Sequence, residues 1–69
     1  MNTAAATKPV RVVLADDHDL VRSGIKALLS MIKDVQVIAE ARNGQELITL
    51  TEELMPDVVM TDISMPGMD

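Results

Sequence analysis

The sequence predicts an α/β fold built on a parallel β-sheet, and two observations support that class. Short apolar runs alternate along the chain with longer segments whose apolar residues repeat at helical spacing. The first and the last of these apolar runs each lead into an acidic residue, Asp16 and Asp62. Strands that alternate with helices favour right-handed crossovers and a parallel sheet. The expected order is therefore strand, helix, strand, helix, strand.

The first strand is expected from Val10 to Ala15. Residues 1–9 are mostly small and end at Pro9, so we expect a flexible leader there, and a proline can begin a strand without losing a ladder hydrogen bond. The strand itself is apolar almost throughout. This composition is typical of a central strand that is covered on both faces.

The first helix is expected to open within Asp16-Asp17-His18-Asp19, with Asp17 or a neighbour as its cap, and to run to about Ile32. Gly24 lies inside it, and close packing of the helix on the sheet would explain a glycine there. An apolar stripe at helical spacing is expected to face the sheet. It consists of Val21, Ile25, Leu28, Leu29 and Ile32.

A turn at Lys33-Asp34 leads to a second strand, Val35 to Ala41, which polar residues interrupt and which we therefore expect at an edge of the sheet. The second helix begins with a capping box, Asn43 at the N-cap and Glu46 three residues later. Its inner face is expected to carry Leu47, Leu50, Thr51 and Leu54. Pro56 ends it, and the third strand follows from Val58 to Thr61.

With the most apolar strand in the centre, the sheet order is 2-1-3. Open α/β sheets place their ligands where the winding direction reverses, here between the first and third strands. Asp16, Asp17 and Asp62 all fall at that point. Three carboxylates held together favour a hard divalent cation such as Mg²⁺, and such a site suits phosphoryl chemistry. Each acidic point taken alone is more typical of a solvated turn than of a metal site.

Composition excludes several other classes. The 69 residues hold no cysteine and no aromatic residue, and the formal net charge is −5. A disulfide framework, base stacking and electrostatic binding of nucleic acid by this chain are therefore not expected. No apolar run approaches the roughly 20 residues of a membrane span, and the start of the chain lacks the pattern of a signal peptide. We expect a cytoplasmic protein that contacts no membrane.

The acidic points also carry a family resemblance. Ala15-Asp16-Asp17-His18, followed by the segment from Asp62 to Asp69 with its Met-Pro-Gly loop, resembles the N-terminal half of a response-regulator receiver domain. The stretch from Asp17 to Gly24 further resembles the NarL/LuxR type of two-component transcriptional regulator. The resemblance covers residues 10–69.

The resemblance implies a role for each matching residue. Asp62 corresponds to the phosphoacceptor, which takes a phosphoryl group from a sensor histidine kinase. Asp16 and Asp17 correspond to the acids that hold Mg²⁺, together with Asp62 and the backbone carbonyl of Ser64. His18 lies in the loop after the first strand and is expected to be solvated, with contact to a partner as the next alternative and a metal-ligand or phosphohistidine role as the least favoured. The protein is then a phosphoacceptor in a phosphorelay and not an enzyme.

The resemblance also implies a partial flavodoxin-like (receiver) fold, truncated before strands 4 and 5. A complete receiver has about 120 residues, an ordinary size for a domain. The family's Ser/Thr and Lys on those strands, and a helix-turn-helix domain that binds DNA, are not in this sequence. We therefore expect residues 10–69 to be largely inactive alone, and to be either largely unfolded or associated through the third strand, with a second copy or with an intact receiver.

Two other functions remain open at this stage. The chain is also compatible with an interaction module that competes for a kinase or a receiver without taking phosphate. A different Mg²⁺-dependent α/β phosphotransferase is the second alternative. Haloacid-dehalogenase-like enzymes, which also use an Asp at a strand end, have a second acid two residues later, where this chain has Ser64. A dinucleotide-binding domain is disfavoured because no G-x-G-x-x-G follows the first strand.

Overall fold

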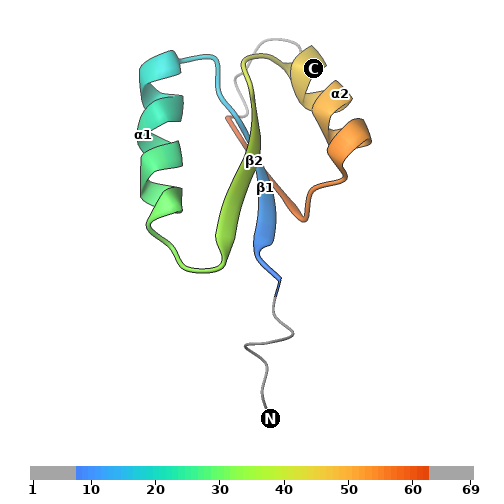
Figure 1. Ribbon diagram of the computed structural model, residues 1–69. Helices are drawn as coiled ribbons and strands as arrows, with labels where there is room; N and C mark the ends of the chain where they lie inside the picture. Colours follow the sequence, from blue (N-terminus) through green and yellow to red (C-terminus); the bar gives the residue numbers. More distant parts are fainter. Residues whose placement is uncertain (1–7, 63–69) are drawn as a thin grey trace.

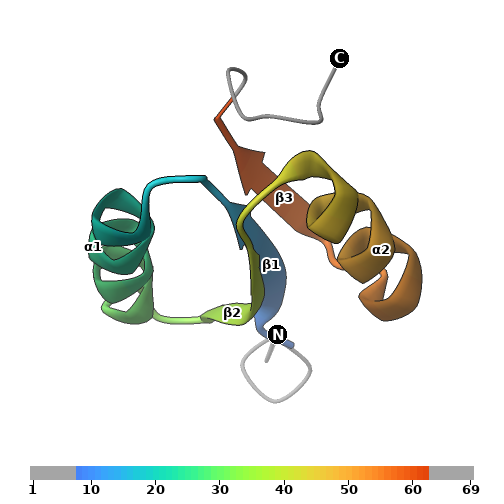
Figure 2. The ribbon, with the colours of Figure 1, turned by 90° about the horizontal axis from the view of Figure 1, so that it is seen from above.

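A computed structural model describes residues 8–62 as three parallel strands with one helix on each face of the sheet (Figures 1 and 2). The elements are β1 (Val10–Ala15), α1 (Asp19–Ser30), β2 (Val35–Ala41), α2 (Gly44–Leu54) and β3 (Val58–Thr61). The sheet order is β2-β1-β3, and β1 pairs in parallel with both neighbours. The predicted class, order and strand limits are confirmed. Residues 1–7, most of the expected leader, lie outside the described part of the chain.

The core forms on both faces of β1, because alternate residues of a strand point to opposite sides. Val13 and Ala15 pack with Ala41 of β2 and Leu47 of α2, and all four are buried. On the other face, Leu14 is 1% exposed and lies beside Ile25 of α1. This burial on two sides explains why β1 has an almost wholly apolar sequence.

Helix α2 ends in a clamp that the sequence did not reveal. Met55 caps the helix with a left-handed backbone, φ 48°, ahead of Pro56. The Arg11 guanidinium donates to the carbonyl oxygens of Leu54 and Met55 at 2.8 and 3.0 Å. A cation at the last carbonyls of a helix complements the helix dipole. Arg11 thereby fastens the end of α2 to the start of β1.

Two features of α1 differ from the expectations. At the start of α1, the N-cap is His18, a neighbour of Asp17 as expected, but its side chain makes no capping hydrogen bond. Gly24 is exposed, and a Cβ added there would meet nothing within 4 Å, so close packing does not explain this glycine.

Of the expected apolar stripe of α1, Ile25 and Leu29 are half-buried, while Val21, Leu28 and Ile32 are 48%, 66% and 51% exposed. The described sheet is too narrow to cover the whole face of α1.

The capping box of α2 is confirmed, with one difference. The Asn43 side chain accepts a hydrogen bond from the Glu46 N–H at 2.8 Å. The Glu46 carboxylate, however, accepts from the N–H of Arg42 at 2.9 Å, one residue before the N-cap. Its interaction with Arg42 lowers the pKa of Glu46. The box therefore also fixes the turn that joins β2 to α2.

Candidate functional site

The site is built where β1 and β3 end side by side. Ala15 and Thr61 are register partners at the last position of the two strands. Asp16 and Asp62 come next in sequence, and the Asp62 N–H donates to the carbonyl oxygen of Ala15 at 3.4 Å. Because the strands run in parallel, both carboxylates emerge at the same edge of the sheet. This is the position that the sequence predicted for them.

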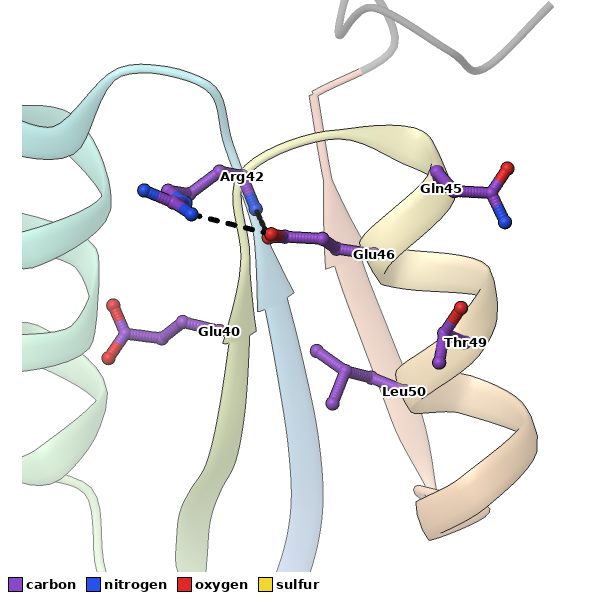
Figure 3. Close-up of a pocket in the computed structure, with 6 residues that line it drawn as sticks. All are labelled: Glu40, Arg42, Gln45, Glu46, Thr49 and Leu50. Atoms are coloured by element: carbon purple, nitrogen blue, oxygen red, sulfur yellow. Dashed lines mark hydrogen bonds and ion pairs between the residues drawn. The ribbon is translucent and has the colours of Figure 1, made fainter.

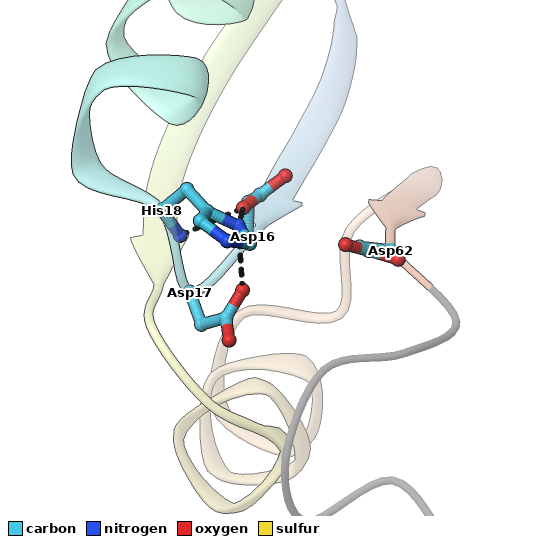
Figure 4. Close-up of side chains that lie close together, drawn as sticks. All are labelled: Asp16, Asp17, His18 and Asp62. Atoms are coloured by element: carbon cyan, nitrogen blue, oxygen red, sulfur yellow. Dashed lines mark hydrogen bonds and ion pairs between the residues drawn. The ribbon is translucent and has the colours of Figure 1, made fainter.

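Four side chains converge at this edge: Asp16, Asp17, His18 and Asp62 (Figure 4). One potential ligand atom from each lies within 4.8 Å of the others. The Asp16 side chain is 9% exposed and that of Asp17 is 33% exposed, so the cluster grades from buried to open. A hollow of about 170 Å³ adjoins it, with Asp16 and Asp62 in its lining. The cluster is thus accessible from solvent on one side.

His18 belongs to this cluster, and the hydrogen bonds it makes there were not predicted from the sequence, which favoured a solvated side chain over a metal ligand. The His18 N–H donates to Asp16 Oδ1 at 2.8 Å, and its Nδ1 lies 3.1 Å from that oxygen and 2.9 Å from Asp17 Oδ1. The hydrogen bond to Asp16, followed by the charge of Asp17, raises the pKa of His18 above its usual value. The ring is nevertheless 65% exposed, as expected. The signal in the sequence was its position directly after two acids.

Arg22 is the second residue that sequence reasoning missed. Its side chain is only 12% exposed, and it lies against the loop that carries Asp16 and Asp17. Its spacing from Asp19 predicts an i,i+3 ion pair, which the structure contains at 2.8 Å. Its contact with Glu40 of β2 depends on how α1 packs, which helical spacing alone does not specify.

The donor set fits the metal that the sequence suggested. Three carboxylates supply oxygen atoms, which are the ligands that Mg²⁺ prefers, and they lie close enough to share one ion. Asp16, Asp17 and Asp62 are brought together as predicted. Ser64, whose backbone carbonyl was expected to complete the site, lies outside the described residues.

Among the described residues, no helix is long and apolar enough to span a membrane.

Comparisons with known proteins all match this chain to response regulators. A family model described as "Response regulator receiver domain" matches residues 12–69. The chain is 45% identical over 62 residues to the nitrate/nitrite response regulator protein NarL of Escherichia coli, a match that covers 90% of this chain and 29% of that protein. It therefore spans less than a third of that curated relative.

Two solved structures show the same similarity in three dimensions. The signal receiver domain of the response regulator NarL from Mycobacterium tuberculosis matches with a TM-score of 0.85 and 44% identity, over 90% of this chain and 50% of that one. The RcsB protein of Salmonella enterica, solved bound to the promoter rprA in the presence of phosphomimetic BeF₃⁻, matches with a TM-score of 0.80 and 37% identity. That match covers 86% of this chain and 29% of RcsB.

Proposed function

Because the chain belongs to the response regulator receiver domain family, and is related to its NarL/LuxR-type members, we propose that Asp62 accepts a phosphoryl group from a histidine kinase. The single observation that carries the proposal is the convergence of Asp62 with Asp16 and Asp17 at the carboxyl ends of β1 and β3. A receiver accepts a phosphoryl group and is not a classical enzyme.

In the proposed reaction, a carboxylate oxygen of Asp62 attacks the phosphorus of a phosphohistidine in the kinase. A P–O bond forms, the P–N bond breaks, and the imidazole leaves and takes up a proton. The product is an acyl phosphate on Asp62. The half-exposed position of Asp62 beside the hollow leaves it open to such a donor.

Asp16 and Asp17 would hold the cofactor Mg²⁺ together with Asp62, and the carbonyl of Ser64 would complete the set. Mg²⁺ bound there supplies positive charge that offsets the carboxylates and the phosphoryl oxygens. The buried Asp16 carboxylate is oriented by the His18 N–H, so its direction is set before an ion arrives. Asp17 is more exposed and is the natural partner for an ion that keeps several waters.

The regulator that contains this chain is proposed to act in the cytoplasm and to bind DNA through a separate domain. The RcsB structure with promoter DNA supports this for a relative. The chain described here carries a net charge of −5, which does not favour contact with DNA phosphates. Control of transcription would therefore belong to the rest of the protein.

The proposal is tested by exposing the natural full-length protein to a small acyl phosphate and following its intact mass. Wild type should gain one phosphoryl group when Mg²⁺ is present and none when the ion is chelated. Asp62→Asn should remain unmodified, whereas Asp34→Asn, which removes the same charge from an exposed turn, should label like wild type. Equal labelling of Asp62→Asn and wild type would refute the proposal.

A further inference from the structure

We infer that Arg22 is a positioning residue for the Mg²⁺ site: its guanidinium holds the peptide between Asp16 and Asp17 so that both carboxylates face Asp62. This inference rests on the proposed function, since it concerns how the same site is prepared for its ion. Arg22 reaches the site through the backbone carbonyl of Asp16.

Each nitrogen of the guanidinium has a separate partner. Nη1 donates to the carbonyl oxygen of Asp16 at 2.8 Å, and Nη2 donates to Asp19 Oδ1 at 2.8 Å. Nε donates to Glu40 Oε1 at 3.1 Å. The rigid fork of an arginine can serve three directions at once, whereas a lysine presents one compact charge. The contact with Asp16 is therefore one arm of a fixed, three-way arrangement.

The other two arms tie the guanidinium to the scaffold. Glu40 lies on β2 and also accepts a hydrogen bond from Lys26 of α1 at 2.9 Å. These two cations lower the pKa of Glu40, Lys26 more than Arg22, so Glu40 remains a carboxylate at neutral pH. Asp19 lies in the first turn of α1. Arg22 is thus anchored to β2 and to the first turn of α1.

The Asp16 peptide is consequently held from several sides. Its N–H donates to the carbonyl of Ala41 on β2 at 3.1 Å, its carbonyl accepts from Arg22, and its carboxylate accepts from the His18 N–H. Without Arg22, the carbonyl of Asp16 would lose its partner from α1. The peptide plane that this carbonyl shares with the Asp17 N–H would then turn more freely, and Asp17 would change direction with it.

Arg42 provides a matched control. It is also an arginine in an ion pair, with Glu46, but its side chain is 67% exposed and it lies beside α2 (Figure 3). Figure 3 also shows Glu40 pointing toward α1. Arg22→Lys and Arg42→Lys make the same chemical change. Only Arg22→Lys alters the hydrogen bonds to Asp16, Asp19 and Glu40.

The experiment measures Mg²⁺ affinity in the natural full-length protein by titrating the amide NMR signals of Asp17 and Asp62. Arg22→Lys should weaken Mg²⁺ binding about tenfold, the usual lower size of such indirect effects on metal sites, and Arg42→Lys should leave it within about twofold. Without Mg²⁺, Arg22→Lys should shift the Asp17 amide signal, while signals of the β1 core stay in place. That metal-free shift separates positioning from a general loss of stability.

The outcomes separate this inference from the proposed function. The proposed site is wrong if wild type does not respond to Mg²⁺, or if Asp17→Asn responds as strongly as wild type. If wild type binds Mg²⁺ and Arg22→Lys binds it equally well, the site stands and the positioning role is refuted. Should Arg22→Lys fail to fold, Glu40→Gln keeps the arginine and removes its anchoring charge. That variant should show a smaller loss of affinity in the same direction, and an unchanged affinity would refute the inference.

Discussion

Neutralising Asp17 should make the metal-free protein more stable, because its carboxylate repels two others. The ligand atoms of Asp16, Asp17 and Asp62 lie within 4.8 Å of one another. At that separation, two unit charges repel by about 0.9 kcal/mol in water and by about 3.5 kcal/mol at the effective dielectric constant of a protein surface. Asp17 is 33% exposed, so the lower figure applies. The Asp17 carboxylate makes two such repulsions, one with Asp16 and one with Asp62, so we expect Asp17→Asn to raise the free energy of unfolding by about 2 kcal/mol at low salt.

The measurement is urea unfolding of the natural full-length protein at alkaline pH, where His18 has lost its proton and no longer offsets the carboxylates. Added Mg²⁺ should stabilise wild type, because an ion that binds the folded state favours that state, and should leave Asp17→Asn almost unchanged. Asp34→Asn is the control, since it removes an equal charge from a position where φ is 67° and asparagine is well tolerated. A metal-free Asp17→Asn no more stable than wild type would contradict the electrostatic reasoning.

Three further predictions concern the scaffold. Gly24→Ala should stabilise the fold by about 1 kcal/mol, because the added methyl meets nothing and helix propensity improves; no gain in thermal unfolding would contradict this. Asn43→Ala should cost about 1 kcal/mol and speed hydrogen exchange in the first turn of α2, where the Glu46 N–H loses its cap; unchanged exchange would count against it. Lys26, and then Arg22, lower the pKa of Glu40, so its ion pairs should stabilise the fold above its usual pKa of 4.5 and fail as pH falls through the lowered value. Stability curves of wild type and Glu40→Gln should converge at acid pH, and parallel curves would refute the assignment.

Local pattern was enough to predict the strands of this fold. Each apolar run ends at a turn or at an acid, and all three strands have the predicted limits. The bulge in β2 was not predictable: Val12 pairs with Val37 and Val13 with Ala39, which leaves Ile38 as an extra residue. That irregularity reflects how two particular strands pack, and neither run alone reports it. The same holds for Gly24, whose environment depends on what lies next to α1.

The carboxylates of the site were predictable for a related reason. Parallel strands place their carboxyl ends at one edge, so the residue after each strand could be assigned to the cluster from topology alone. The contacts of Arg22 with Asp16 and Glu40 were not predictable, because they are set by side-chain direction and by how α1 packs on β2. The contact of Arg22 with the Asp16 carbonyl exists only after the helix, the loop and Glu40 are assembled.

The most direct test of the central claim is chemical location of the phosphoryl group on Asp62. The natural full-length protein is treated with a small acyl phosphate and Mg²⁺, the acyl phosphate is reduced with borohydride, and the peptides are sequenced by mass spectrometry. We predict that reduction converts Asp62 to homoserine, and that Asp16 and Asp17 in the same sample remain aspartate. Homoserine at either of those positions, or at none of the three while the protein carries phosphate, would contradict the assignment of Asp62 as the acceptor.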